Sequence, residues 1–74
     1  MINHSPKILS SELINILVAE EERIKKENNV TGSLEVDRVL PTSLDLLFDG
    51  RYLGGRYYRL LGSYNLENKF FIWE

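Results

Sequence analysis

The stretch GSLEVDRVLPTSLDLLFDG, residues 32–50, decides the fold because its apolar residues follow a period of two. Leu34 and Val36 alternate with acidic residues, which is the pattern of a strand with one buried face. We expect this strand to run to about Leu40, because Pro41 lacks the backbone N–H group that a sheet uses. The stretch therefore predicts that the chain enters a β-sheet at this point.

The second half of the stretch alternates as well, from Leu44 through Leu46 to Phe48. We expect a second strand here, beginning at about Ser43. A short helix capped by Thr42 or by the following serine is the alternative, because the residues from Leu46 to Phe48 are continuously apolar. The alternation favours the strand.

Two glycine-containing pairs mark the expected turns after this strand. Asp49-Gly50 is typical of a two-residue hairpin turn, in which both positions need a positive φ. We expect a return strand to start at Arg51–Leu53, and Gly54-Gly55 to permit a bulge or a sharp bend. Further strands are predicted at about 56–64 and 69–73, where apolar and aromatic residues dominate, with a turn between them.

The N-terminal third of the chain has the period of a helix. Apolar residues recur at helical spacing as far as Ile24, and charged residues fill the second half of the segment. Ser5-Pro6 can cap and begin the helix, and a start at Ser10 or Ser11 is the alternative. We place the helix at about residues 6–28.

These elements together predict an α+β fold in a single domain, residues 1–74. The N-terminal helix packs on a strongly twisted antiparallel meander of four or five strands, over about residues 33–74. A sheet that curls partly into a small barrel is the alternative. We find no internal repeat, and no linker long enough to divide the chain.

The sequence offers few residues for catalysis or for metal binding. It has no cysteine and one histidine, His4, so neither a Cys–His pair, a serine triad nor a zinc site of these residues is expected. The glycines of residues 50–55 match neither common phosphate-binding motif. A carboxylate pair among Glu35, Asp37, Asp45 and Asp49 is the remaining catalytic alternative, although alternation turns several of these side chains towards solvent. We therefore predict no enzymatic activity, no catalytic residue, no cofactor and no metal.

Nothing in the sequence predicts secretion or membrane insertion. The first residues lack the features of a signal peptide, and the longest mainly apolar run, Leu13–Ala19, is far shorter than a membrane span. The absence of cysteine also fits a reducing compartment. We expect a cytoplasmic protein with no membrane partner. The net charge of −2 does not favour general attraction to nucleic acid.

The segment from Gly50 to Tyr64 is the only basic part of the chain, with three arginines and no acidic residue. Arginine can bind carboxylates or phosphates, and tyrosine buries a large area in protein interfaces. Alternation predicts that Tyr58, Leu60 and Tyr64 point inward, whereas their neighbours point outward. The alternative to a binding surface is that the arginines only pair with acidic residues of adjacent strands.

The last strand offers a second candidate surface, because its four consecutive large apolar residues occupy both faces. A single helix can hardly cover both faces of this strand, so an aromatic pair on the surface is one expectation. The alternative is a central strand that a curled sheet covers on both sides. The residues that we predict to contact a partner are Arg51, Tyr52, Arg56, Tyr57, Arg59, Phe71 and Trp73.

We therefore expect a small non-catalytic protein that binds another macromolecule, preferably a protein, as an accessory subunit or inhibitor. A phage-type inhibitor of a host defence enzyme is one example of this kind. A homodimer is also compatible, because small domains without disulfides often gain stability by association. The alternative is a nucleic-acid-binding module that uses the Arg/Tyr stretch 51–59, which the acidity of the whole chain disfavours.

Overall fold

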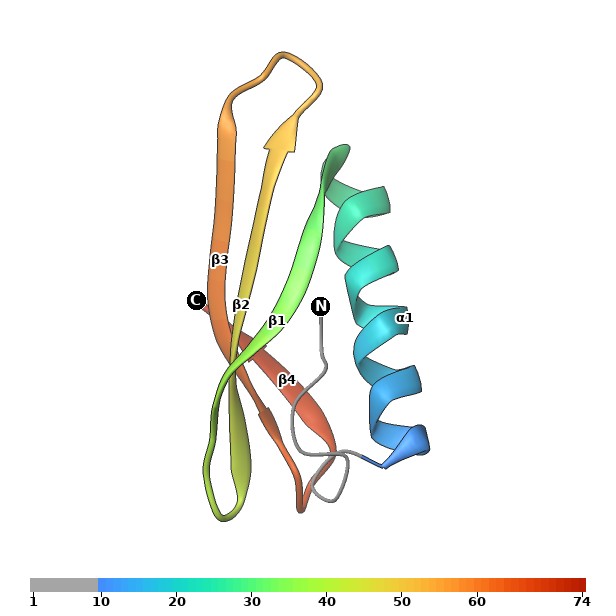
Figure 1. Ribbon diagram of the computed structural model, residues 1–74, viewed down its shortest axis with the longest axis vertical. Helices are drawn as coiled ribbons and strands as arrows, with labels where there is room; N and C mark the ends of the chain where they lie inside the picture. The colour runs from blue at the N-terminus through green and yellow to red at the C-terminus, as the bar shows by residue number, and fades with distance from the viewer. Residues whose placement is uncertain (1–9) are drawn as a thin grey trace.

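The computed structural model describes residues 10–74 of the chain. It contains one helix that is followed by four strands (Figure 1). The elements are α1 (Ser11–Asn28), β1 (Val30–Val39), β2 (Ser43–Tyr52), β3 (Tyr57–Asn65) and β4 (Phe70–Trp73). The predicted α+β class is confirmed. Within the described residues, no helix is long and apolar enough to cross a membrane.

The helix α1 begins at Ser11 because the residue before it acts as the N-cap. The backbone of Ser10 is extended, and its side-chain oxygen accepts a hydrogen bond from the N–H of Leu13 at 3.1 Å. This bond satisfies a backbone donor that has no partner inside the helix. The predicted start at about residue 6 is therefore replaced by the alternative start, and Ser5-Pro6 lies outside the described residues.

The strands pair in chain order, β1-β2-β3-β4, and every pair is antiparallel. The predicted meander is confirmed, with four strands rather than five. The sheet stays open, so the small barrel that we considered does not form. A β-bulge between Val36 and Arg38 shifts the register of β1 against β2, and such bulges bend and twist a strand.

The strand β2 confirms the prediction of a strand at Ser43–Phe48 and corrects the predicted turn at Asp49-Gly50. It continues through both turn residues to Tyr52, so the predicted return strand is the end of β2 itself. Gly50 lies opposite Gly32 of β1, and a Cβ atom on either glycine would overlap backbone atoms of the other strand. Gly50 is therefore needed for the close approach of two strands rather than for a turn.

The hairpin turn lies a few residues later, at the glycine pair where we expected a bulge or bend. The N–H of Tyr52 donates to the carbonyl of Arg56 at 2.8 Å, and the N–H of Gly55 donates to the carbonyl of Tyr52 at 2.8 Å. Gly55 has a φ of 94°, which glycine adopts more easily than other residues. In Figure 1 this hairpin projects beyond the end of α1.

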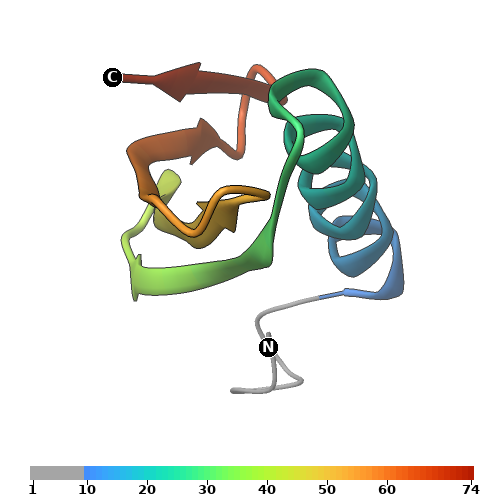
Figure 2. The ribbon, with the colours of Figure 1, turned by 90° about the horizontal axis from the view of Figure 1, so that it is seen from above.

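The core lies between α1 and one face of the sheet, which we call the inner face (Figure 2). Its largest fully buried side chains are Leu17, Ile24, Leu34, Leu44, Leu46 and Phe48. Tyr58, Leu60 and Tyr64 face this core as predicted, with Tyr64 buried and the other two partly buried. The opposite face, here called the outer face, has no helix against it in the described part of the chain.

Candidate interaction surface

Four apolar side chains gather on the outer face around β3 and β4. Leu61, Phe70 and Ile72 are 50%, 44% and 51% exposed, and Leu47 is partly buried. The register brings them together, because Leu61 pairs with Leu47, and Ile72 pairs with Ser63, the next residue of β3 on the same face. We call these four apolar residues the outer patch. It is turned away from α1, so the core does not bury it.

A charged and aromatic group, which we call the Asp49 cluster, adjoins the outer patch on β2 and β3. Asp49 accepts hydrogen bonds from the Tyr57 hydroxyl and from Nε of Arg59, the latter at 3.0 Å. The guanidinium carbons of Arg59 and Arg51 lie 5.6 and 5.9 Å from the centre of the Tyr57 ring. The Tyr57 hydrogen bond, and then Arg59, hold the pKa of Asp49 below its ordinary value. These four residues therefore support one another on the surface.

Two of the predicted partner residues lie on the other side of the hairpin, at the end of the inner face. The guanidinium carbon of Arg56 is 5.2 Å from the centre of the Tyr52 ring. The Tyr52 ring in turn packs edge-on against Tyr58, with 5.3 Å between the ring centres. Leu53, at the tip of the hairpin, is 88% exposed. The five predicted residues of the Arg/Tyr stretch thus divide between the Asp49 cluster and this end of the hairpin.

The other two predicted partner residues, Phe71 and Trp73, lie on the inner face and pack against the core. The ring centre of Phe71 is 4.6 Å from that of Tyr64, and Trp73 stacks on Phe71 at 6.1 Å. The indole N–H of Trp73 donates to a carboxylate oxygen of Glu20 at 2.8 Å. Both side chains therefore join β4 to the core, and it is the opposite face of β4 that is exposed.

Our sequence reasoning missed Leu61, Phe70 and Ile72 as surface residues. Alternation separates the two faces of β4, but it does not say which face meets the helix. The inward position of Tyr64 indicates which face of β4 meets the core, because a residue directly opposite an inward residue on the next strand lies on the same face of the sheet. Phe71 is that residue, so counting across the turn between β3 and β4 would have placed its neighbours outside.

Glu20 is the one buried carboxylate among residues 10–74, with 8% of its surface exposed. Nε and Nη2 of Arg23 donate to its two oxygens at 2.8 and 2.5 Å, and the indole of Trp73 donates as well. The hydrogen bonds from Arg23 lower the pKa of Glu20 more than its burial raises it. The carboxylate therefore stays ionised at neutral pH and links α1 to β4, which is a structural role.

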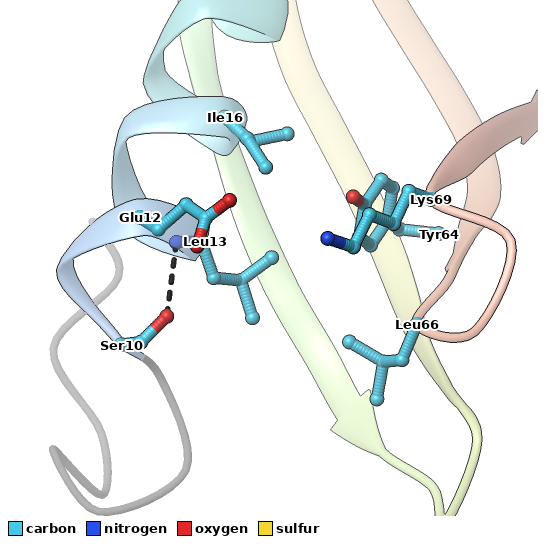
Figure 3. A pocket seen from close by; sticks show the side chains of 7 residues that line it. All are labelled: Ser10, Glu12, Leu13, Ile16, Tyr64, Leu66 and Lys69. Carbon is cyan, nitrogen blue, oxygen red and sulfur yellow. Dashed lines mark hydrogen bonds between the residues drawn. The ribbon is translucent and has the colours of Figure 1, made fainter.

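An open cavity of about 230 Å³ lies between the start of α1 and the turn from β3 to β4 (Figure 3). Its lining residues are Ser10, Glu12, Leu13, Ile16, Tyr64, Leu66 and Lys69. The hydrogen bond drawn among them is the one from Leu13 to Ser10 that caps the helix. No group of three metal-ligating side chains occurs in the part of the chain that the structure describes, and His4 lies outside it. That the chain is not an enzyme stays a prediction.

No family model, curated protein or solved structure matches the chain. The function therefore has to be inferred from the surface features of the molecule. They are the apolar outer patch, the adjoining Asp49 cluster and the projecting hairpin, which all lie on or beside the sheet.

Proposed function

We propose that the chain is a small non-catalytic protein that binds a partner protein through the outer face of its sheet, as an accessory subunit or an inhibitor. The observation that carries this proposal is the outer patch, in which three large apolar side chains are each about half exposed. Single exposed apolar residues are ordinary, but contiguous groups of them mark interaction sites. A partner that covers the outer patch removes this apolar surface from water, which favours binding.

The Asp49 cluster gives the outer patch a polar border of the kind that protein interfaces have. Tyrosine and arginine are enriched in interfaces because they combine a large contact area with hydrogen-bonding groups. Tyr57 is 56% exposed, yet its hydroxyl is held by Asp49 and its ring lies beside two guanidinium groups. A side chain that is already held in place loses less conformational entropy on binding.

The charges of the outer face favour a protein partner over nucleic acid. Asp49 forms an ion pair with Arg59, with 3.0 Å between its Oδ1 and the arginine Nε. Asp45 forms a second ion pair, with 3.7 Å between its Oδ2 and Nε of Arg38. The nucleic-acid alternative would depend on the remaining arginines of the hairpin, which is a small basic footprint.

Affinity purification from the cells that produce the protein tests the proposal. The tagged wild-type chain is compared with a variant that carries Leu61→Thr and Ile72→Thr, which makes the outer patch polar and keeps residues suited to strands. Val39→Thr is the matched control, because Val39 is a strand residue of similar exposure, 41%, outside the outer patch. We expect wild type and control to capture the same protein and the double variant to lose it. Equal capture by all three, or no capture, contradicts the proposal.

Nuclease treatment and a salt titration of the captured complex decide between the two partner classes. Phosphate contacts release counterions, so a nucleic-acid complex weakens steeply as salt is added. A complex held by the outer patch is expected to survive both treatments. Loss of the complex on nuclease treatment would support the nucleic-acid alternative.

A further inference from the structure

One edge of β3 is open along its first half. The strand β4 pairs with Gly62–Asn65, and the N–H of Glu74 donates to the carbonyl of Leu61 at 2.9 Å. Among the described residues, no strand lies beside the part of β3 that precedes Leu61. Backbone groups alternate in direction along a strand, so Tyr57 and Arg59 direct their N–H and C=O groups to the same side as Leu61. These groups therefore point to the open edge.

The pairing of β3 with β2 supports this assignment of directions. At one end of the pair, the N–H of Tyr52 donates to the carbonyl of Arg56. At the other end, the N–H of Leu66 donates to the carbonyl of Thr42. The backbone groups of even-numbered residues in β3 thus form hydrogen bonds with β2, and those of odd-numbered residues point away from β2.

An arginine lies on each face of the sheet beside the open edge: Arg59 of β3 is on the outer face, and Arg56, just before β3, is at the end of the inner face. Arg59 uses its Nε for Asp49, which leaves the terminal nitrogens of its guanidinium group for a further acceptor. Arg56 is exposed and forms no ion pair within the described residues. Charged side chains on an edge strand discourage indiscriminate pairing with other strands. Because both charges are positive here, a strand with carboxylates is admitted and a basic strand is repelled.

We propose that an extended acidic segment of the partner protein adds to this edge of β3, next to Tyr57 and Arg59. Its backbone bonds to the free groups of these two residues, and its carboxylates lie near Arg56 and Arg59. The added strand lies in line with β4, so the side chains on one of its faces adjoin the outer patch. The inference rests on the proposed function and specifies how the partner binds.

Selection of peptides from a random displayed library against the intact wild-type chain supplies the probe. Amide hydrogen exchange of the labelled chain is then measured by NMR, with and without a saturating selected peptide. We expect acidic peptides to be enriched, and to slow exchange at Tyr57 and Arg59 by at least about tenfold, because these amides gain hydrogen-bond partners. Exchange at Tyr58 and Leu60 changes much less, since these amides already bond to β2.

Two matched comparisons test the charge and the backbone contribution separately. Arg56→Glu is expected to weaken peptide binding by about tenfold, through repulsion of the acidic strand. Lys26→Glu makes the same change of charge on an exposed position of α1 and leaves binding unchanged. A peptide that is N-methylated on the amides facing β3 is expected to lose binding, whereas methylation of the alternate amides is tolerated.

Several results would overturn this inference. One such result is a selection that enriches no peptide, or one that enriches peptides that are not acidic. Another is that the selected peptides leave amide exchange at Tyr57 and Arg59 unchanged. A dimer in sedimentation that protects the same two amides in the free chain would also overturn it, since a second copy would then occupy the edge. None of these results depends on capture by the outer-patch variant, so strand addition can fail while the proposed function stands.

Discussion

The carboxylate of Glu20 joins the helix to the last strand through hydrogen bonds from Arg23 and Trp73. Glu20→Gln keeps the shape of the side chain and removes its charge, so both donors lose a charged acceptor. We expect the free energy of unfolding to fall by about 1–3 kcal/mol in urea denaturation. Glu22→Gln is the control, because the Glu22 side chain is 65% exposed. Removing its charge is expected to change the free energy of unfolding by less than about 0.5 kcal/mol. Equal stability of the two variants would contradict the structural role of Glu20.

The same carboxylate makes the stability of the fold depend on pH. The pKa of Glu20 in the folded chain lies below its ordinary value of 4.5, so the ionised form stabilises the fold. This contribution is present above the ordinary value, and it is lost as the pH falls through the pKa of the folded state. Unfolding of wild type and Glu20→Gln is measured from neutral to acidic pH. We expect the difference between them to shrink at acidic pH, and a constant difference would contradict the argument.

The hydroxyl of Tyr57 is the main cause of the low pKa of Asp49. Tyr57→Phe removes this hydrogen bond and leaves the contact between Asp49 and Arg59 in place. We expect the pKa of Asp49 to rise towards its ordinary value of 3.8. NMR titration of the Asp49 carboxyl carbon measures the change. An unaltered pKa would mean that the hydroxyl does not hold the carboxylate in solution.

At the scale of the elements, the contact between β1 and β2 requires two glycines to face each other. Gly50→Ala places a Cβ atom against the backbone of β1, and we expect a loss of at least about 2 kcal/mol in the free energy of unfolding. Gly54→Ala is the control, because nothing lies within 4 Å of a Cβ atom there. Its expected effect lies between none and a gain of about 1 kcal/mol. A reversed order of the two effects would place the hairpin turn at Asp49-Gly50 after all.

The position of Gly50 also shows which kinds of element can be predicted from the sequence. The helix and the alternating strands follow from periods that extend over many residues, and their presence was predicted correctly, although α1 begins at Ser11 rather than at about residue 6. Asp49-Gly50 has the local chemistry of a turn, but Gly50 is placed by contact with Gly32, which is distant in the sequence. The bulge that shifts β1 against β2 was missed for the same reason, since it depends on the pairing of two strands.

At the scale of the whole molecule, only part of the candidate site could be predicted. Tyr57 and Arg59 were expected to point outward together, because alternation along one strand is visible in the chain, and the structure brings both together with Arg51 around Asp49. The outer patch depends instead on which face of the sheet α1 covers. That choice is made by packing between distant residues, and alternation within a single strand does not contain it.

The outer patch is expected to matter for binding and not for folding. Because Leu61 and Ile72 are about half exposed, Leu61→Thr with Ile72→Thr should change the free energy of unfolding by less than about 1–2 kcal/mol. Thermal and urea denaturation of the double variant measure this. A much larger loss would show that the outer patch stabilises the domain, and its variants could then no longer report on contact with a partner.

Calorimetric titration of the captured partner into the chain tests the central claim, that the outer face is the binding surface. We expect the Leu61→Thr and Ile72→Thr variant to bind at least about tenfold more weakly than wild type, because two apolar side chains leave the contact. Val39→Thr should bind within about twofold of wild type, because Val39 lies outside the outer patch. A twofold change in affinity corresponds to about 0.4 kcal/mol in binding free energy. Binding of the double variant with wild-type affinity would contradict the account.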